Sequence, residues 1–246
     1  MLNVAAYHFV PIEQPDALAA ALRASAESAH LLGTVIVARE GINLFLSGPD
    51  AALRGWMDLL KDDPRFAPMH VKFSDSERRP FRKLLVKVKP EIISFRQFGI
   101  EPGKARAPSV TPEKLAAWIA NRRDDDGRYV VLLDTRNMQE VSHGTFERAL
   151  TLPIGKFTDL PEALEQHREA LRDKTVVTFC TGGIRCEKAA LWMQNSGFRN
   201  VFQLQGGILN YFEQVGGQGY AGACFVFDER VALDPQLQPV AAGQGE

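Results

Sequence analysis

Two short apolar runs in the second half of the chain restrict its fold most strongly. "YVVLLD" (129–134) and "KTVVTF" (174–179) are rich in β-branched and other apolar residues. Such runs are typical of strands that are covered on both faces, and helical segments lie between and after them. A β–α–β order predicts a parallel sheet with helices on both faces. Ligands of such sheets gather at the carboxyl ends of strands, so Asp134 and Cys180 become candidate site residues.

The first 98 residues show a different pattern, in which strands and amphipathic helices form a β–α–β–β–α–β order with one extra strand. Helices are expected over 16–32 and around Leu53, Trp56, Met57 and Leu60, which recur with helical spacing. Strands are expected at "VAAYHFVPI", "GTVIVAREGINLFLSG" (two strands that turn at Glu40-Gly41), "MHVKFSDS" and "KLLVKVKPEII". This order predicts a ferredoxin-like α+β sandwich over residues 1–98.

Proline and glycine mark the division between the two parts. "GIEPGKARAPSVTP" (99–112) holds three prolines and two glycines, which is typical of a linker. Thr111 then caps a helix whose first residue is Pro112. We therefore expect a second, α/β domain over 113–218 with a central parallel sheet, followed by a C-terminal extension over 219–246.

The composition favours a globular protein of the cytoplasm. The chain has 246 residues, of which 45% are hydrophobic and 24% charged, and its net charge of -1 neither indicates nor excludes a nucleic-acid partner. Three cysteines are too few for a disulfide framework, which favours a reducing compartment. There is no secretion signal and no apolar run long enough to cross a bilayer, so we expect no membrane association.

The segment "TFCTGGIRCEKAA" (178–190) is the strongest candidate for a reactive site. After the strand ends at Cys180, the residues Thr181, Gly182, Gly183 and Ile184 must turn the chain into a helix. Main-chain N–H groups in such a turn, beside a helix N-terminus, bind negative charge and favour a thiolate. Arg185 adds a permanent cation. We expect Cys180 to be an ionised nucleophile that is open to substrate, the alternative being a cysteine that only packs at a strand end.

The spacing of the segment separates it from the tyrosine phosphatases, whose arginine follows the cysteine after five intervening residues. Here only four residues, Thr181 to Ile184, separate Cys180 from Arg185. A ring that is one residue smaller suits a sulfur atom or a small anion better than a phosphoryl group. The spacing therefore makes a phosphatase the less favoured assignment.

Several nearby residues are further candidates, and Asp134 and Cys186 have two interpretations each. Asp134 is expected to support the cysteine loop by bonding its amides or Arg185, unless it caps a helix, and Glu140 is expected to pair with Arg136. Cys186 is either a resolving or sulfur-carrying thiol or a packed residue beneath the loop. Cys224 fits a strand or core position.

A basic segment, "SERRPFRKLLVKVK", is the candidate RNA-binding surface. Arg78, Arg79, Arg82 and Lys83 surround Phe81 and could hold an RNA backbone. The alternative is a strand edge that carries cations to prevent aggregation. No cofactor fingerprint of the Rossmann or Walker type occurs, and the five histidines are scattered, so we predict neither a resident cofactor nor a metal site.

Residues from about 128 to 213 resemble a rhodanese domain. "LLDTRNMQEVSHGTFERALTLPI", the cysteine loop and "GFRNVFQLQGGILNY" occur in the order of that family. Rhodaneses carry sulfane sulfur as a persulfide on the loop cysteine, which corresponds to Cys180. The resemblance therefore implies a sulfur-reactive Cys180.

A narrower resemblance covers nearly the whole chain. "GTVIVAREGIN", "LLVKVKPEIISF", "DTRNMQEVSHGTF", "FCTGGIRCEKA", "LQGGIL" and "CFVFDERVAL" are similar to the bacterial tRNA uridine(34) hydroxylase family. The resemblance implies a ferredoxin-like (acylphosphatase-like) domain joined to a rhodanese domain, with the anticodon region of tRNA as partner. It also implies an oxygen-dependent formation of 5-hydroxyuridine at the wobble position that requires Cys180, with molecular oxygen as co-substrate.

Two other functions remain open from the sequence. A sulfurtransferase would pass sulfane sulfur from a Cys180 persulfide to an acceptor. A non-catalytic binding module would have no need for the thiol, and the intact cysteine loop disfavours it.

Overall fold

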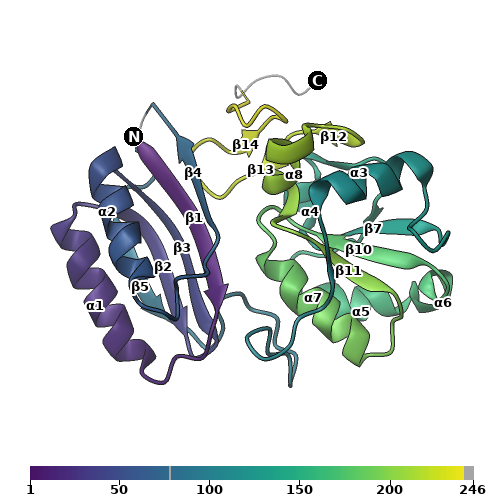
Figure 1. Cartoon of the computed structure of the whole chain (residues 1–246), viewed down its shortest axis with the longest axis horizontal. Helices are drawn as coiled ribbons and strands as arrows, with labels where there is room; N and C mark the ends of the chain where they lie inside the picture. The colour runs from purple at the N-terminus through teal and green to yellow at the C-terminus, as the bar shows by residue number, and fades with distance from the viewer. Residues whose placement is uncertain (78, 241–246) are drawn as a thin grey trace. The chain divides into compact units, whose positions relative to one another are not determined.

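The computed structural model describes residues 1–77 and 79–240, which form two compact units. The first unit comprises Met1–Ser94 with Glu101–Lys104. The second comprises Phe95–Ile100 and the described residues from Ala105 onward. Figure 1 labels most elements of both units, and its colours follow the chain from the N-terminus to the C-terminus.

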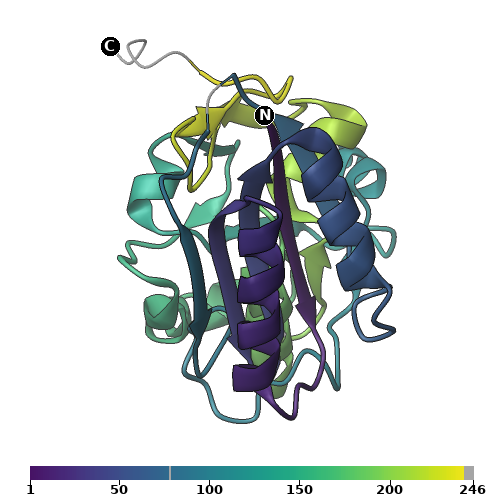
Figure 2. The ribbon, with the colours of Figure 1, turned by 90° about the vertical axis from the view of Figure 1, so that its left-hand side faces the viewer.

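The first unit is a five-stranded sheet with two helices on one face. Its elements are β1 (Leu2–Phe9), α1 (Pro15–Ser28), β2 (Leu32–Ala38), β3 (Gly41–Gly48), α2 (Asp50–Lys61), β4 (Val71–Asp75) and β5 (Leu84–Val88), and the strand order is β4-β1-β3-β2-β5. Figure 2 shows α1 and α2 over the same face of the sheet. The order confirms the predicted ferredoxin-like fold. The added strand β5 runs parallel to β2, whereas the other neighbours are antiparallel.

The turn predicted at Glu40-Gly41 connects β2 to β3, and side chains in and after the turn bond to Ile92. Gly41 has a φ of +149°, and a Cβ atom there would lie 2.0 Å from the His8 carbonyl oxygen, so only glycine fits. The Glu40 carboxylate accepts a hydrogen bond from the Ile92 N–H at 2.7 Å. The Asn43 side chain donates to the Ile92 carbonyl at 3.2 Å. These residues therefore fix the chain after β5.

The second unit contains the predicted parallel sheet, in the order β6-β11-β10-β7-β9. Its strands are β6 (Ser109–Val110), β7 (Val130–Asp134), β9 (Leu150–Thr151), β10 (Thr175–Phe179) and β11 (Val201–Leu204), and each neighbouring pair is parallel. Every residue of β10 is buried, as the apolar run predicts. The short strand β6 lies within the stretch expected to be a linker.

Helices cover both faces of this sheet. They are α3 (Pro112–Asn121), α4 (Met138–Val141), α5 (Leu160–Glu165), α6 (Arg168–Leu171), α7 (Ile184–Asn195) and α8 (Gly207–Val215), with a 3-10 turn at Phe157–Asp159. In Figure 1, α3 and α8 lie on one face and α5 and α7 on the other. The predicted cap of α3 is present, since the Thr111 hydroxyl accepts a hydrogen bond from the Lys114 N–H at 3.3 Å.

The C-terminal segment adds two small antiparallel ladders. They pair β8 (Gly144–Phe146) with β12 (Tyr220–Gly222), and β13 (Cys224–Phe225) with β14 (Ala232–Leu233). Phe146 packs edge-on against Phe179, Tyr211 and Tyr220. Residues 219–240 are thus part of the second unit. No helix within residues 1–77 or 79–240 has the length and apolar character needed to span a bilayer.

Candidate functional site

The cysteine loop connects β10 to α7 at the carboxyl end of the parallel sheet. Gly183, with a φ of +100°, directly precedes α7, so Arg185 and Cys186 lie in the first turn of that helix. The helix ends at Asn195, and Gly197 has a φ of +85°. These positions confirm the predicted strand–loop–helix arrangement. They also place the N-terminal end of a 12-residue helix beside Cys180, where its dipole favours a negative charge.

The Cys180 sulfur is surrounded by hydrogen-bond donors. The Gly183 N–H donates to it at 3.1 Å. Burial alone would raise the pKa of Cys180, but a hydrogen bond from the Cys186 thiol and the charge of Arg185 oppose that effect. Together with the N–H groups of Arg185 and Gly183, they lower the pKa to about 5. A thiolate is therefore the form of Cys180 near neutral pH, as the loop composition predicts.

The expectation that Cys180 is open to substrate is wrong for this conformation. The Cys180 side chain is 0% exposed. Its surroundings are nevertheless polar. Gly182 is half-buried, and a Cβ atom at that position would meet nothing within 4 Å, which marks free space on one side of the loop.

Arg185 is held by Glu140 rather than by Asp134. Its two terminal nitrogens each donate to a Glu140 carboxylate oxygen at 2.6 Å, and both side chains are buried. Glu140 also completes a capping box with Asn137 at the start of α4. The predicted Glu140–Arg136 pair is therefore wrong. The sequence reasoning missed this contact because it joins residues that are 45 positions apart.

Asp134 pairs with Arg136, its neighbour two positions along. The Arg136 Nη2 atom lies 2.6 Å from an Asp134 carboxylate oxygen, and neither side chain is exposed. The Thr145 hydroxyl donates to the same carboxylate at 2.7 Å, and Arg136 also donates to the Gly144 carbonyl at 2.7 Å. The predicted bond from Asp134 to Arg185 or the loop amides is therefore wrong. Asp134 and Arg136 instead form hydrogen bonds that connect β7 to β8.

The other two cysteines differ from Cys180 in their ionisation. Burial raises the pKa of Cys186, and the adjacent Cys180 sulfur raises it further, so Cys186 stays protonated and donates to Cys180. Its sulfur also lies 3.9 Å from the Thr135 hydroxyl oxygen. Burial raises the pKa of Cys224 to about 12, which fits the predicted core position. All three are free thiols.

The glycine pair Gly206-Gly207 lets the start of α8 approach the backbone of the cysteine loop. The sequence alone did not assign this role to the pair. The Ile208 N–H donates to the Cys180 carbonyl at 2.9 Å, and the Leu209 N–H donates to the Thr181 carbonyl at 3.1 Å. A Cβ atom on Gly207 would lie 2.5 Å from the Cys180 carbonyl oxygen. The signal for this contact was present in "LQGGIL", because two adjacent glycines at a strand–helix junction indicate close backbone approach.

The basic segment lies at the edge of the first unit's sheet. Arg79, Arg82 and Lys83 are exposed in the connection that leads to the edge strand β5, and Lys87 is exposed on that strand. Both interpretations of this segment, an RNA contact and a protected sheet edge, fit the arrangement. Arg78 lies outside the described residues.

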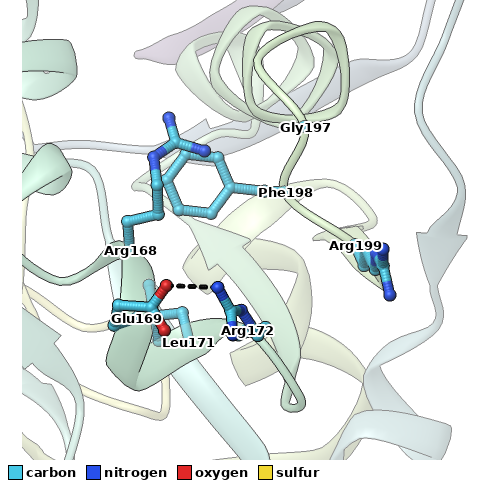
Figure 3. Close-up of a pocket in the computed structure, with 7 residues that line it drawn as sticks. All are labelled: Arg168, Glu169, Leu171, Arg172, Gly197, Phe198 and Arg199. Atoms are coloured by element: carbon cyan, nitrogen blue, oxygen red, sulfur yellow. Dashed lines mark hydrogen bonds and ion pairs between the residues drawn. The ribbon is translucent and has the colours of Figure 1, made fainter.

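A hollow of about 220 Å³ lies between α6 and the turn after α7. Arg168 stacks over the Phe198 ring at 4.3 Å, and Arg172 pairs with Glu169 (Figure 3). These residues precede β10 and β11, so the hollow is at the amino ends of the strands, opposite to Cys180. It is therefore distinct from the cysteine site. Across the described part of the chain, no three His, Cys, Asp or Glu side chains are grouped as a metal ion would require.

Comparison with family models assigns a separate match to each half of the chain. Residues 1–92 match the model described as the UPF0176 acylphosphatase like domain, and residues 113–214 match the rhodanese-like domain. Both agree with the observed folds.

Similar proteins extend over nearly the whole chain. A tRNA uridine(34) hydroxylase of Xanthomonas euvesicatoria is 62% identical over 98% of this chain and 97% of its own length. The proteins of the same name from Xanthomonas oryzae and Xylella fastidiosa are 61% and 58% identical, over 94% and 93% of their own lengths. The similarity thus includes both units and the C-terminal segment.

Proposed function

Because the chain belongs to the tRNA uridine(34) hydroxylase family, we propose that it converts uridine 34 of tRNA to 5-hydroxyuridine in a reaction that depends on Cys180. It is thus an oxidoreductase that modifies tRNA, with the anticodon region as its substrate. Molecular oxygen is the proposed co-substrate, and the cytoplasm, which suits three free thiols, is the proposed compartment.

The observation that carries this proposal is the ionised sulfur at the sheet's carboxyl end. A thiolate is the reactive form of cysteine, and Cys180 has a pKa of about 5 despite its burial. Arg185 supplies a fixed positive charge beside it, while Glu140 fixes the guanidinium in place. Cys186 keeps its proton and donates a hydrogen bond to the Cys180 sulfur. The site therefore provides a nucleophile whose charge is stabilised before any substrate arrives.

The tRNA contact proposed for the first unit uses the exposed cations Arg79, Arg82 and Lys83. Lysine and arginine side chains gain affinity for a nucleic-acid backbone by displacing its counterions. Asp134 and Arg136 have a proposed supporting role, since they join β7 to β8.

Nucleoside analysis of total tRNA tests the proposal. Cells without the gene should lack the 5-hydroxyuridine that this protein forms, and the wild-type gene should restore it with an oxygen atom from isotopically labelled oxygen gas. Cys180→Ser should not restore it. The matched control Cys224→Ala removes another buried thiol and should restore the nucleoside fully. Restoration by Cys180→Ser would contradict the role of the thiolate.

A sulfurtransferase is the second candidate, because the rhodanese-like domain carries an intact thiolate on its loop. In that reaction the Cys180 sulfur attacks the outer sulfur of thiosulfate, the S–S bond of thiosulfate breaks, and sulfite leaves. Mass spectrometry would then show one additional sulfur atom on Cys180. Rapid turnover of this kind, with unchanged tRNA nucleosides in the deletion strain, would favour sulfur transfer over hydroxylation.

A further inference from the structure

An exposed aromatic side chain, Phe227, lies beside the reactive loop. It follows β13 in the hairpin that β13 forms with β14, and it is 55% exposed. The Val226 N–H donates to the Val231 carbonyl at 2.8 Å, which closes the hairpin. The Arg230 side chain pairs with Asp228 at 2.6 Å inside this turn. The ring is thus presented by an ordered hairpin rather than by a free segment.

Two contacts connect this hairpin to the cysteine loop. The Thr181 hydroxyl donates to the Phe225 carbonyl at 3.3 Å. The Phe227 ring centroid lies 6.0 Å from the Arg185 Cζ atom, within the range of a cation–π contact. Phe225 packs edge-on against Phe227 and contacts the His143 ring, each at 5.2 Å. An aromatic face therefore stands next to the residue that stabilises the thiolate.

Glu140 takes two of the five N–H donors of Arg185 and fixes the orientation of its guanidinium. A uridine that reacts at C5 must leave its base stack, and proteins receive such bases on aromatic side chains. Phe227 supplies a surface of this kind at the loop. Its partial exposure leaves room for a second ring.

We propose that Phe227 stacks against the extruded pyrimidine ring of the substrate nucleotide and holds it at the Cys180 loop. This inference rests on the proposed function, since it takes a tRNA uridine as the substrate. The competing role for Phe227 is to shield the Arg185–Glu140 ion pair from water, which any apolar side chain would do.

Binding of a synthetic anticodon stem-loop with uridine at position 34 tests the proposal. Phe227→Ala and Phe227→Leu should weaken binding by about 5- to 150-fold, the range expected for the loss of one base–aromatic stack. Phe227→Tyr and Phe227→Trp should bind nearly as the wild type does. The pH at which Cys180 ionises should stay the same in all four variants. If Phe227→Leu binds normally, the ring only shields the ion pair and the proposal is overturned.

A second RNA locates the contact. A stem-loop with an abasic residue at position 34 should bind the wild type more weakly, by a factor similar to that of Phe227→Ala, but should bind Phe227→Ala no more weakly than the intact stem-loop does. If the abasic residue and Phe227→Ala each weaken binding independently, so that their factors multiply when the two are combined, the proposal is overturned.

A matched control is available at the opposite end of the sheet. Tyr129 is 54% exposed and contacts Arg123 at 4.0 Å, but it precedes β7. Tyr129→Ala should leave stem-loop binding unchanged. If the wild-type protein forms no 5-hydroxyuridine, the proposed function is refuted. If the wild type is active and Phe227→Ala binds the stem-loop with normal affinity, only this inference is refuted.

Discussion

At the scale of single residues, the surroundings of Cys180 combine features that the sequence shows with features that it hides. Arg185 and the glycines are neighbours of Cys180 in the chain, so their role was predictable. The Asp134–Arg136 pair also had a local signal, because Asp63–Arg65 and Asp228–Arg230 repeat the Asp-x-Arg spacing. In these three pairs, the arginine N–H and guanidinium bond the preceding aspartate. In a fourth, Asp126–Arg128, only the guanidinium does so, and the Arg128 N–H bonds Asp124. Glu140 had no such signal, since its contact with Arg185 depends on tertiary packing.

The Arg185–Glu140 pair gives a stability prediction. Glu140→Gln keeps the capping box with Asn137, because glutamine accepts the same N–H. It removes the carboxylate that pairs with the buried Arg185 cation, which is left with only the Cys180 thiolate as counter-charge. Such a change costs about 3–5 kcal/mol of unfolding free energy. Urea denaturation of the full chain measures it. Glu165→Gln, in an exposed pair with Arg168, serves as the control and should change stability little. An equally small effect of Glu140→Gln would contradict the assigned pairing.

At the scale of elements, the loop is held between the N-terminal ends of α7 and α8. The alternation of apolar strands and helices predicted the order of these elements, because periodicity is a local property of the sequence. It could not predict that the first N–H groups of α8 would bond the carbonyls of Cys180 and Thr181. That contact brings two backbones together, and only the absence of a side chain at Gly207 permits it.

Gly207→Ala tests this contact. Gly207 has a φ of +69°, and a new Cβ atom would lie 2.5 Å from the Cys180 carbonyl oxygen and 2.7 Å from the Gly183 nitrogen. The loop must then shift, and a misplacement of about 1 Å lowers the rate of catalysis by about 100-fold. The rate of 5-hydroxyuridine formation measures it.

Gly197→Ala is the matched control for this substitution. Gly197 also has a positive φ, but a Cβ atom there would meet nothing within 4 Å. It should lose about 1–2 kcal/mol of stability through backbone strain and keep its activity in the folded protein. Equal activities of the two variants would show that the close approach at Gly207 is unimportant.

At the scale of the whole molecule, both fold classes were predictable from the sequence. The exact residues at which the two units divide were not. Composition places the end of the first domain near residue 98. In the structure, Phe95–Ile100 belongs to the second unit, where Phe95 stacks on Phe157 at 4.5 Å. A linker-like composition cannot show which distant ring a phenylalanine will meet. The basic segment is likewise visible in the sequence, but its partner is not.

Removal of the exposed cations tests the RNA contact of the first unit. The combined variant Arg79→Ala, Arg82→Ala and Lys83→Ala should weaken tRNA binding. It should also reduce the slope of log affinity against log salt, by about 0.7–0.9 for each phosphate group that the protein no longer neutralises. Filter binding over a range of salt concentrations measures the slope.

The charge-matched control for this variant is Arg54→Ala, Arg65→Ala and Lys104→Ala. Each of these cations already faces a carboxylate, so the salt slope should remain that of the wild type. Identical slopes for the two triple variants would instead indicate that the basic segment only protects the sheet edge.

The ionisation of Cys180 can be measured directly from the ultraviolet absorbance of its thiolate. The titration of Cys180→Ala is subtracted from that of the wild type, both as full-length protein. Because the folded-state pKa is lowered, the thiolate should form as the pH rises through about 5 and persist above it. A single absorbance step at that pH supports an activated nucleophile. A step near the ordinary thiol value of about 8.5 would contradict it.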